Sequence, residues 1–311
     1  MGIADMLNQL GVAYDSEQGT MMIEKVMEYI TNASYQASSF IAKEKGASSI
    51  FDEEAYMECP FVKEALSEQT HNMIRKNGLR NIAIMSIAPT GSISNIVLGY
   101  KSEEKNYIGV SGGVEPIFST FYTRRSESFG NKMFKVFHST IQAYIDKMGI
   151  QEDVDKAEDV DEVLPEFLTR TAHKIDSVKR VGVQGVIQRY IDHSISSTIN
   201  LPEDVEPETI SDIYIKAWKN KLKGVTIYRD GSRFPILSVE NKMTEFQEMK
   251  NKSFSIMQEN GETIDMAGDD IFKRPDGKLT TMYHHLKKMK TESEDESTTT
   301  ETVATTEEVK V

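Results

Sequence analysis

Cysteine is almost absent from this sequence of 311 residues, in which Cys59 is the only one. A single thiol can form neither an intrachain disulfide nor a cysteine-based metal cluster. Long apolar runs are also missing, because no window approaches the roughly 18 uncharged apolar residues of a membrane-spanning helix. The N-terminal residues lack the basic segment and apolar core of a secretory signal. These absences favour a soluble, cytoplasmic protein with no membrane partner.

Positive charge is scarce as well. The chain has 36 Lys and Arg against 49 Asp and Glu, a net charge of −13. A general nucleic-acid binder would need Lys and Arg to neutralise phosphates, so this class is disfavoured. Part of the acidic excess lies in residues 290–311, which are rich in Thr, Ser and Glu and have little to bury; we predict a disordered acidic tail there. His284 and His285 lack a nearby third ligand, so no metal site is predicted.

The remaining pattern predicts an α/β protein with helices packed outside a mostly buried sheet. Expected helices cover residues 20–45, 67–76, 129–148, 181–194 and 206–223. Expected strands cover residues 82–88, 117–123 and 225–228, with a charged loop at 100–113 and an acidic surface connection at 151–162. We predict a main domain at 1–235, a C-terminal extension at 236–289 and the tail at 290–311.

The most informative stretch is residues 81–95, NIAIMSIAPTGSISN. Its apolar run, Ile82 to Ala88, ends at Pro89, which is typical of a strand buried on both faces, although a buried helix segment would look the same. The hydroxyl-rich loop that follows contains Gly91, so its backbone can curl and present N–H groups to an anion. An ordinary polar turn has the same composition.

Six segments, in order, resemble the large catalytic subunit of ribonucleotide reductase, and more closely its adenosylcobalamin-dependent class II branch. They span about 230 residues and lie at 2–16, 37–47, 79–95, 111–125, 192–202 and 223–233. The resemblance implies the C-terminal half of a ten-stranded α/β barrel with helices outside. In that family a thiyl radical removes the 3′-hydrogen of a ribonucleotide substrate.

The resemblance also assigns a substrate-phosphate-binding loop. Backbone amides and hydroxyls of the matching loop hold the phosphates in the family, and the matching positions here are Pro89, Thr90, Gly91, Ser92, Ile93 and Ser94. Convergent N–H donors can serve a phosphate group without a lysine. The sequence leaves the substrate open between a ribonucleoside diphosphate and a triphosphate.

The chain departs from the family at its cysteines. The radical cysteine belongs to an Asn-x-Cys-x-Glu motif, which is absent here, and Cys59 lies in a region that is peripheral in the family. We therefore expect no catalytic residue in this chain, which looks like one half of a split enzyme, inactive alone, whether split by gene fission or by an intein. The expected partners are an N-terminal reductase chain with the radical cysteine and redox-active thiols, and a thioredoxin-like reductant. Adenosylcobalamin would be shared with that chain.

One strand, expected at residues 225–228, favours the class II branch of the family. Class I enzymes pass the radical through two adjacent tyrosines, where this chain has Ile227-Tyr228. Isoleucine has no accessible one-electron oxidation, whereas a radical made in place by adenosylcobalamin needs no such relay. Two other functions stay open: a non-catalytic nucleotide- or sugar-phosphate-binding module that survives from a reductase, and a structural partner that only completes another chain's fold.

Overall fold

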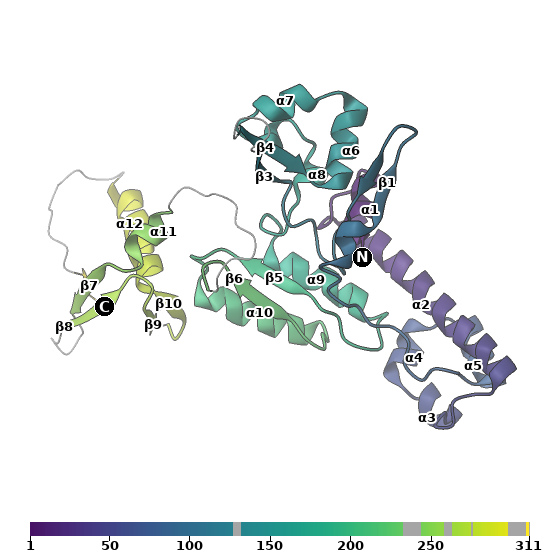
Figure 1. Cartoon of the computed structure of the whole chain (residues 1–311). Helices are drawn as coiled ribbons and strands as arrows, with labels where there is room; N and C mark the ends of the chain where they lie inside the picture. Colours follow the sequence, from purple (N-terminus) through teal and green to yellow (C-terminus); the bar gives the residue numbers. More distant parts are fainter. Residues whose placement is uncertain (127–131, 233–243, 258–262, 275, 298–308, 311) are drawn as a thin grey trace. The chain divides into compact units, whose positions relative to one another are not determined.

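The computed structural model describes residues 1–126, 132–232, 244–257, 263–274, 276–297 and 309–310 (Figure 1). The chain forms two compact units. The first consists of Met1–Asn200 and Ile215–Tyr228, and the second of Leu201–Tyr214 and Arg229–Val311. The divisions predicted at residues 235 and 289 stay predictions.

The first unit is built along one long helix. Short α1 (Ile3–Gln9) precedes α2 (Glu17–Lys45), whose first turn is capped by Ser16, which accepts a 3.0 Å hydrogen bond from the N–H of Gly19. Gly46 ends α2 at φ 82°, a conformation that favours glycine. The helix predicted at 20–45 is confirmed, with a start three residues earlier.

The C-terminal half of α2 carries a small helical cluster, visible at the lower right of Figure 1. It comprises α3 (Glu53–Met57), α4 (Pro60–Ala65) and α5 (Glu68–Asn77). Their shared core consists of Tyr35, Val62, Leu66, Ile74 and Leu79. The helix predicted at 67–76 is confirmed as α5.

Two hairpins follow in the sequence. The first joins β1 (Leu98–Lys101) to β2 (Asn106–Ile108) after a 3₁₀ turn, η1 (Ile93–Ile96), so the loop predicted at 100–113 was wrong over these strands. The second joins β3 (Phe121–Ser126) to β4 (Lys132–Phe137). The strand predicted at 117–123 begins later, at Phe121.

The helix predicted at 129–148 is wrong in its first half. Residues 132–137 form β4, residues 127–131 lie outside the described part, and only α6 (Ser139–Met148) is helical. The spacing of the apolar side chains in this segment fits a helix or a strand. Antiparallel pairing with β3, which sets Phe121 opposite Phe137, selects the strand. Next come α7 (Gln151–Lys156), η3 (Val160–Glu162) and α8 (Glu166–Thr169), so the acidic surface connection expected at 151–162 consists of two short helical turns.

The next elements largely follow prediction. The helix expected at 181–194 is α9 (Ser177–Gln188), shifted toward the N-terminus, and the helix expected at 206–223 is α10 (Pro207–Lys219). The strand expected at 225–228 is β6 (Thr226–Arg229), which pairs with β5 (Thr198–Leu201). Buried apolar residues of α1, α2, α6 and α9 share the main core of the first unit.

The strand predicted at 82–88, buried on both faces, was wrong. Only Ile87 forms a bridge, parallel to Ile195, and no residue from 82 to 88 is fully buried. The described strands pair into four two-stranded sheets and one of three strands. The predicted half of a ten-stranded barrel is therefore not present as one continuous sheet among the described residues. The structure is a mixed α/β fold. A parallel strand needs neighbours on both sides to be buried, and this segment has one.

The second unit holds α11 (Glu245–Met249), two hairpins and a helix. The hairpins pair β7 (Ser253–Met257) with β8 (Thr263–Ala267), and β9 (Ile271–Lys273) with β10 (Leu279–Thr281). Helix α12 (Met282–Ser297) extends into the tail predicted to be disordered, so residues 290–297 are helical. Strand β11 (Val309–Lys310) pairs with β7, and the rest of the tail lies outside the described residues. None of the described helices combines the length and the apolar character that crossing a membrane requires.

Candidate functional site

A cavity of about 830 Å³ lies in the first unit where segments distant in sequence meet. Its walls come from three of the six segments singled out in the sequence, 79–95, 111–125 and 192–202, together with β2, the end of β4 and the start of α6. A volume of this size suits a ligand as large as a nucleotide. The cavity is therefore the candidate functional site.

The 89–94 loop forms one wall. Pro89, Gly91 and Ser94 line the cavity, whereas Ser92 and Ile93 are exposed to solvent beside it. The structure thus brings half of the six predicted residues to the cavity, and Thr90 lies behind them.

The loop backbone turns so that several N–H groups stay free. The N–H of Ser94 donates to the carbonyl oxygen of Thr90 at 3.0 Å, which closes the turn, and η1 continues from it. Within the described chain, the backbone N–H groups of Gly91 and Ser92 donate no hydrogen bond. The side chain of Ser92 also caps nothing, since no hydrogen bond from the turn reaches it. These groups are thus available to an anion.

The segment Ser111–Gly113 holds the loop from behind. The N–H of Gly113 donates to Oγ1 of Thr90 at 2.7 Å, and Thr90 has φ 51°, a conformation rarely taken by residues other than glycine. A side chain at Gly112 would meet the carbonyl oxygen of Pro89, because an added Cβ would lie 2.7 Å from it. The close approach of the two backbones explains the glycine pair.

Glu115, which lines the cavity, forms an ion pair with the buried Arg180. Nη2 of Arg180, on α9, donates to Oε2 of Glu115 and to Oγ of Ser197, both at 2.6 Å. Oε1 of Glu115 accepts the N–H of Thr198 at 2.9 Å, so the carboxylate ties the 111–118 segment to β5. Burial lowers the pKa of the Arg180 guanidinium, but the neighbouring Tyr14 and Glu115 raise it by more. The guanidinium therefore stays charged and compensates Glu115.

A buried carboxylate, that of Asp5, contacts two residues of the cavity wall. Asp5, on α1, accepts hydrogen bonds from Nε2 of His138 at 2.7 Å, from Oγ1 of Thr140 at 2.6 Å and from the N–H of Ser111 at 2.7 Å. Burial raises the pKa of Asp5, but the bond and charge of His138 and the other donors outweigh it and lower the pKa to about 2. His138 itself lines the cavity.

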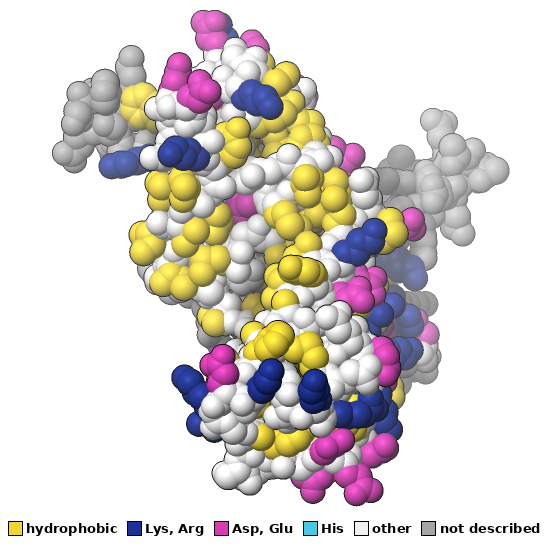
Figure 2. Space-filling view, turned by 90° about the vertical axis from the view of Figure 1, so that its right-hand side faces the viewer, with side chains coloured by type: hydrophobic (Ala, Val, Ile, Leu, Met, Phe, Trp, Pro, Cys, Tyr) yellow, Lys and Arg dark blue, Asp and Glu magenta, His cyan; other side chains and the backbone are white. Residues whose placement is uncertain are grey.

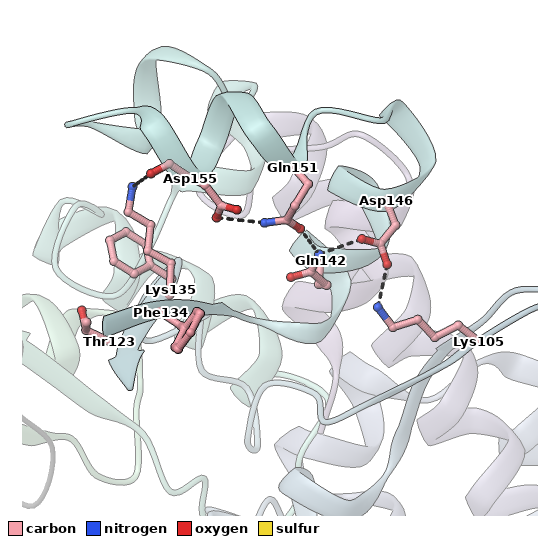
Figure 3. Close-up of a pocket in the computed structure, with 9 residues that line it drawn as sticks. Lys105, Thr123, Phe134, Lys135, Gln142, Asp146, Gln151 and Asp155 are labelled. Atoms are coloured by element: carbon pink, nitrogen blue, oxygen red, sulfur yellow. Dashed lines mark hydrogen bonds and ion pairs between the residues drawn. The ribbon is translucent and has the colours of Figure 1, made fainter. Parts of the chain in front are cut away.

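Another cavity, of about 700 Å³, lies between β3, β4, α6 and α7 (Figure 3). Its polar side chains bind one another: Asp146 accepts from Lys105 and from Gln142, each at 2.7 Å, and Gln142 also donates to Gln151. Lys135 donates to the carbonyl oxygens at the end of α7. Because these polar groups already form hydrogen bonds with one another or with the backbone, their arrangement serves the fold and does not point to a ligand.

Sequence reasoning gave no role to several polar residues of the functional cavity, among them Ser111, Glu115, His138 and Asn200. Two of the segments that contain them had been recognised, but no role had been given to their side chains. His138 lay in a stretch interpreted as the middle of a helix, so no signal in the sequence pointed to it. Cys59 is exposed at the start of α4.

A family model matches most of the chain. The model for the barrel domain of ribonucleotide reductase matches residues 1–228, which include every wall of the cavity. The structure also resembles the class Id ribonucleotide reductase alpha subunit of Actinobacillus ureae, with a TM-score of 0.51 and 20% identity, over 74% of this chain and 38% of that one. At this identity the likeness concerns the fold alone.

Curated relatives give the same family. The chain is 28% identical over 247 residues to a protein of Mycobacterium tuberculosis named vitamin B12-dependent ribonucleoside-diphosphate reductase. It is 30% identical over 246 residues to a protein of the same name from Thermoplasma acidophilum. Each match covers 75% of this chain but only 31% and 28% of the relative. The chain thus corresponds to less than a third of the length of these relatives.

Proposed function

The chain belongs to the ribonucleotide reductase barrel-domain family, and we propose that it helps convert ribonucleotides to deoxyribonucleotides by holding the substrate's phosphate groups. The observation that carries this proposal is the 89–94 loop, whose free N–H groups lie beside a cavity of nucleotide size. A phosphate would accept from the N–H groups of Gly91 and Ser92 and from the hydroxyl of Ser92. Pro89 and Ser94 would shape the wall, and Thr90 would fix the loop's curvature.

The chemistry of hydrogen abstraction needs groups that this chain lacks. Its single cysteine, Cys59, lies on the exposed start of α4 and does not line the described cavity. We therefore propose that a separate N-terminal reductase chain supplies the radical cysteine and the redox-active thiols, with a thioredoxin-like protein as reductant. In this arrangement the chain has no activity alone.

Uncovered apolar surface supports a partner. Exposed side chains include Tyr29 and Phe40 of α2, and Ile96 and Leu98 before and within β1. Figure 2 shows hydrophobic side chains gathered at several places on the face that lies to the right in Figure 1, where α2 and β1 run. Together with the half-exposed segment 82–88, this surface favours burial against further parts of the enzyme.

The names of the curated relatives, together with Ile227 in place of a relay tyrosine, favour adenosylcobalamin as the radical source. The cofactor would supply the radical in place, without a tyrosine relay. The functional cavity, of about 830 Å³, suits a ligand of nucleotide size rather than a corrin ring. We therefore propose that the partner chain contributes to holding the cofactor.

One observation favours a second candidate. This candidate is a non-catalytic nucleotide-phosphate-binding module derived from a reductase. Such a module would have the same cavity but would need no radical cysteine, and Cys59, the only cysteine, is exposed. Mixing the purified chain with a reductase chain that carries an Asn-x-Cys-x-Glu motif, with adenosylcobalamin and dithiol, separates the two. Reduction only in the mixture supports the reductase component. Turnover by this chain alone would refute the split arrangement, and an inactive mixture would favour the module.

The loop itself is tested with Ser92→Ala in the assembled enzyme. Because the Ser92 side chain makes no capping bond, its loss should leave the melting temperature unchanged. One lost charge-assisted hydrogen bond should weaken substrate binding by about 1–3 kcal/mol, seen as a raised KM with little change in kcat. An unchanged KM would remove the loop from the site.

A further inference from the structure

We propose that His138 and Ser111 form a second contact for the phosphate groups of the substrate, on the cavity wall next to the 89–94 loop. The inference deepens the proposed function and rests on it. Both residues line the same cavity as Pro89, Gly91 and Ser94. They come from the start of α6 and from the segment behind the loop, and neither was singled out in the sequence.

His138 has one ring nitrogen fixed and one available. Nε2 lies 2.7 Å from Oδ1 of Asp5, and because that carboxylate is ionised and already accepts two other donors, Nε2 must carry hydrogen. Nδ1 makes no hydrogen bond among the described residues, and the side chain does not cap α6 although His138 occupies the N-cap position. The imidazole is thus held in place by Asp5 while its Nδ1 can contact a ligand.

Ser111 supplies an independent sign of a missing ligand. The residue is only 5% exposed, and its Oγ has no hydrogen-bond partner in the described structure. A buried hydroxyl without a partner is costly, and such groups occur where a ligand or water completes the set. The N–H of Ser111 donates to Oδ2 of Asp5, so one carboxylate holds Ser111 and His138 side by side.

Charge at this wall favours an anion. Asp5 contacts His138, and the acidic or phenolic groups that line the same cavity are Glu115 and Tyr122. Asp5 accepts three hydrogen bonds, and Glu115 is compensated by Arg180. No Lys or Arg is among the described residues that line the cavity, so His138 is the basic side chain there. The positive end of the α6 dipole adds to its effect.

A chain of hydrogen bonds connects this wall to the loop. The carbonyl oxygen of Ser94 accepts the N–H of Val110 at 3.0 Å, and the next residue, Ser111, donates to Asp5. Three hydrogen bonds and the peptide link between Val110 and Ser111 thus connect the loop to His138. In the proposed arrangement one phosphate of a diphosphate lies on the loop amides and the other on His138 and Ser111.

The experiment measures binding of inorganic pyrophosphate to the full chain by titration calorimetry at pH 6 and pH 8. The variants are His138→Gln, Ser111→Ala and, for the loop, Ser92→Ala. Glutamine can place an amide N–H where Nε2 lies, so the bond to Asp5 and the fold are kept, which the melting temperature checks. Because pyrophosphate itself titrates in this range, each variant is compared with the unchanged protein at the same pH.

Each variant removes one contact to the phosphate, so we expect His138→Gln to weaken binding about tenfold and Ser111→Ala about fivefold at each pH. Equal affinity of His138→Gln and the unchanged protein at both pH values overturns the inference.

The same titrations separate this inference from the proposed function. If Ser92→Ala weakens binding while His138→Gln and Ser111→Ala do not, the loop holds phosphate and only the inference fails. If pyrophosphate binds to neither the unchanged protein nor its variants, both fail. Cytidine, which has no phosphate, should show no dependence on His138 at either pH, and such a dependence would assign His138 to the sugar or base instead.

Discussion

Nε2 of His138 and Oδ1 of Asp5 lie 2.7 Å apart although 133 positions separate the two residues in the sequence. The contact joins α1 to the start of α6 and holds the backbone of Ser111 through the same carboxylate. A single buried acid on α1 therefore positions two parts of the cavity wall, Ser111 and the start of α6.

The first prediction concerns stability against acid. The pKa of Asp5 is about 2, below its ordinary value of 3.8, so the carboxylate stabilises the fold by about 2 kcal/mol above pH 4 and loses that contribution as the pH falls toward 2. Asp5→Asn should lower the free energy of unfolding by about 2–4 kcal/mol at pH 7, and by clearly less at pH 3. Urea unfolding at both pH values measures this difference. An equal loss of unfolding free energy at pH 7 and pH 3 would contradict an ionised Asp5 carboxylate.

The second prediction concerns the segment 82–88. The carboxylate of Asp192 accepts the N–H groups of Ile84 and Met85, at 2.6 and 2.7 Å, and the hydroxyl of Tyr35 at 2.5 Å. Asp192→Ala should destabilise the chain by about 2–4 kcal/mol and remove hydrogen-exchange protection at Ile84 and Met85. Tyr35→Phe, the matched control, removes one donor and should leave both amides protected. Protected amides in Asp192→Ala would show that another contact holds the segment.

Local signals in the sequence were sufficient for α2 and α5, whereas short helices such as α3, α4 and α8 were not predicted. Ser16 and Gly46 at the ends of α2, and Ser67 and Gly78 at the ends of α5, are caps that neighbouring residues determine. Such signals act within one turn, so spacing alone reveals them. The loop after Pro89 was also recognisable, because its composition and the family resemblance agree.

Non-local contacts decided what could not be predicted. The apolar run 82–88 predicted a buried strand, but burial depends on neighbours that the run itself does not encode, and only one neighbour, around Ile195, is present. Residues 132–137 have an apolar pattern that fits either a helix or a strand, and pairing with β3 decides it. His138 became a site candidate only through Asp5, whose distance in the sequence hides the contact.

The third prediction concerns Cys59. The residue is exposed and occupies the N-cap position of α4, where its side chain makes no capping bond. Serine is a better N-cap, so Cys59→Ser should leave the melting temperature unchanged or slightly raised. Activity of the assembled enzyme should stay within about threefold, because this thiol lies outside the described cavity. A loss of roughly 10⁴-fold, the scale of a removed nucleophile, would give Cys59 a catalytic role.

The fourth prediction contrasts two glycines that lie close to each other in the cavity wall. An added Cβ at Gly91 would meet no atom within 4 Å, whereas one at Gly112 would lie 2.7 Å from the carbonyl oxygen of Pro89. Gly91 also has an ordinary backbone conformation, since it is not among the glycines with positive φ. The free protein therefore tolerates a side chain at Gly91 and not at Gly112.

Gly91→Val should accordingly keep the melting temperature of the unchanged protein and raise the KM of the assembled enzyme at least about tenfold, because a branched side chain would stand where phosphate approaches the backbone. Gly112→Ala should instead lower the melting temperature, with a loss of about 1–3 kcal/mol in unfolding free energy, because the two backbones are pushed apart. Melting temperature and KM are measured on the same samples. If Gly91→Val leaves KM unchanged, no ligand approaches the loop backbone at this point, and the phosphate must be held elsewhere on the cavity wall.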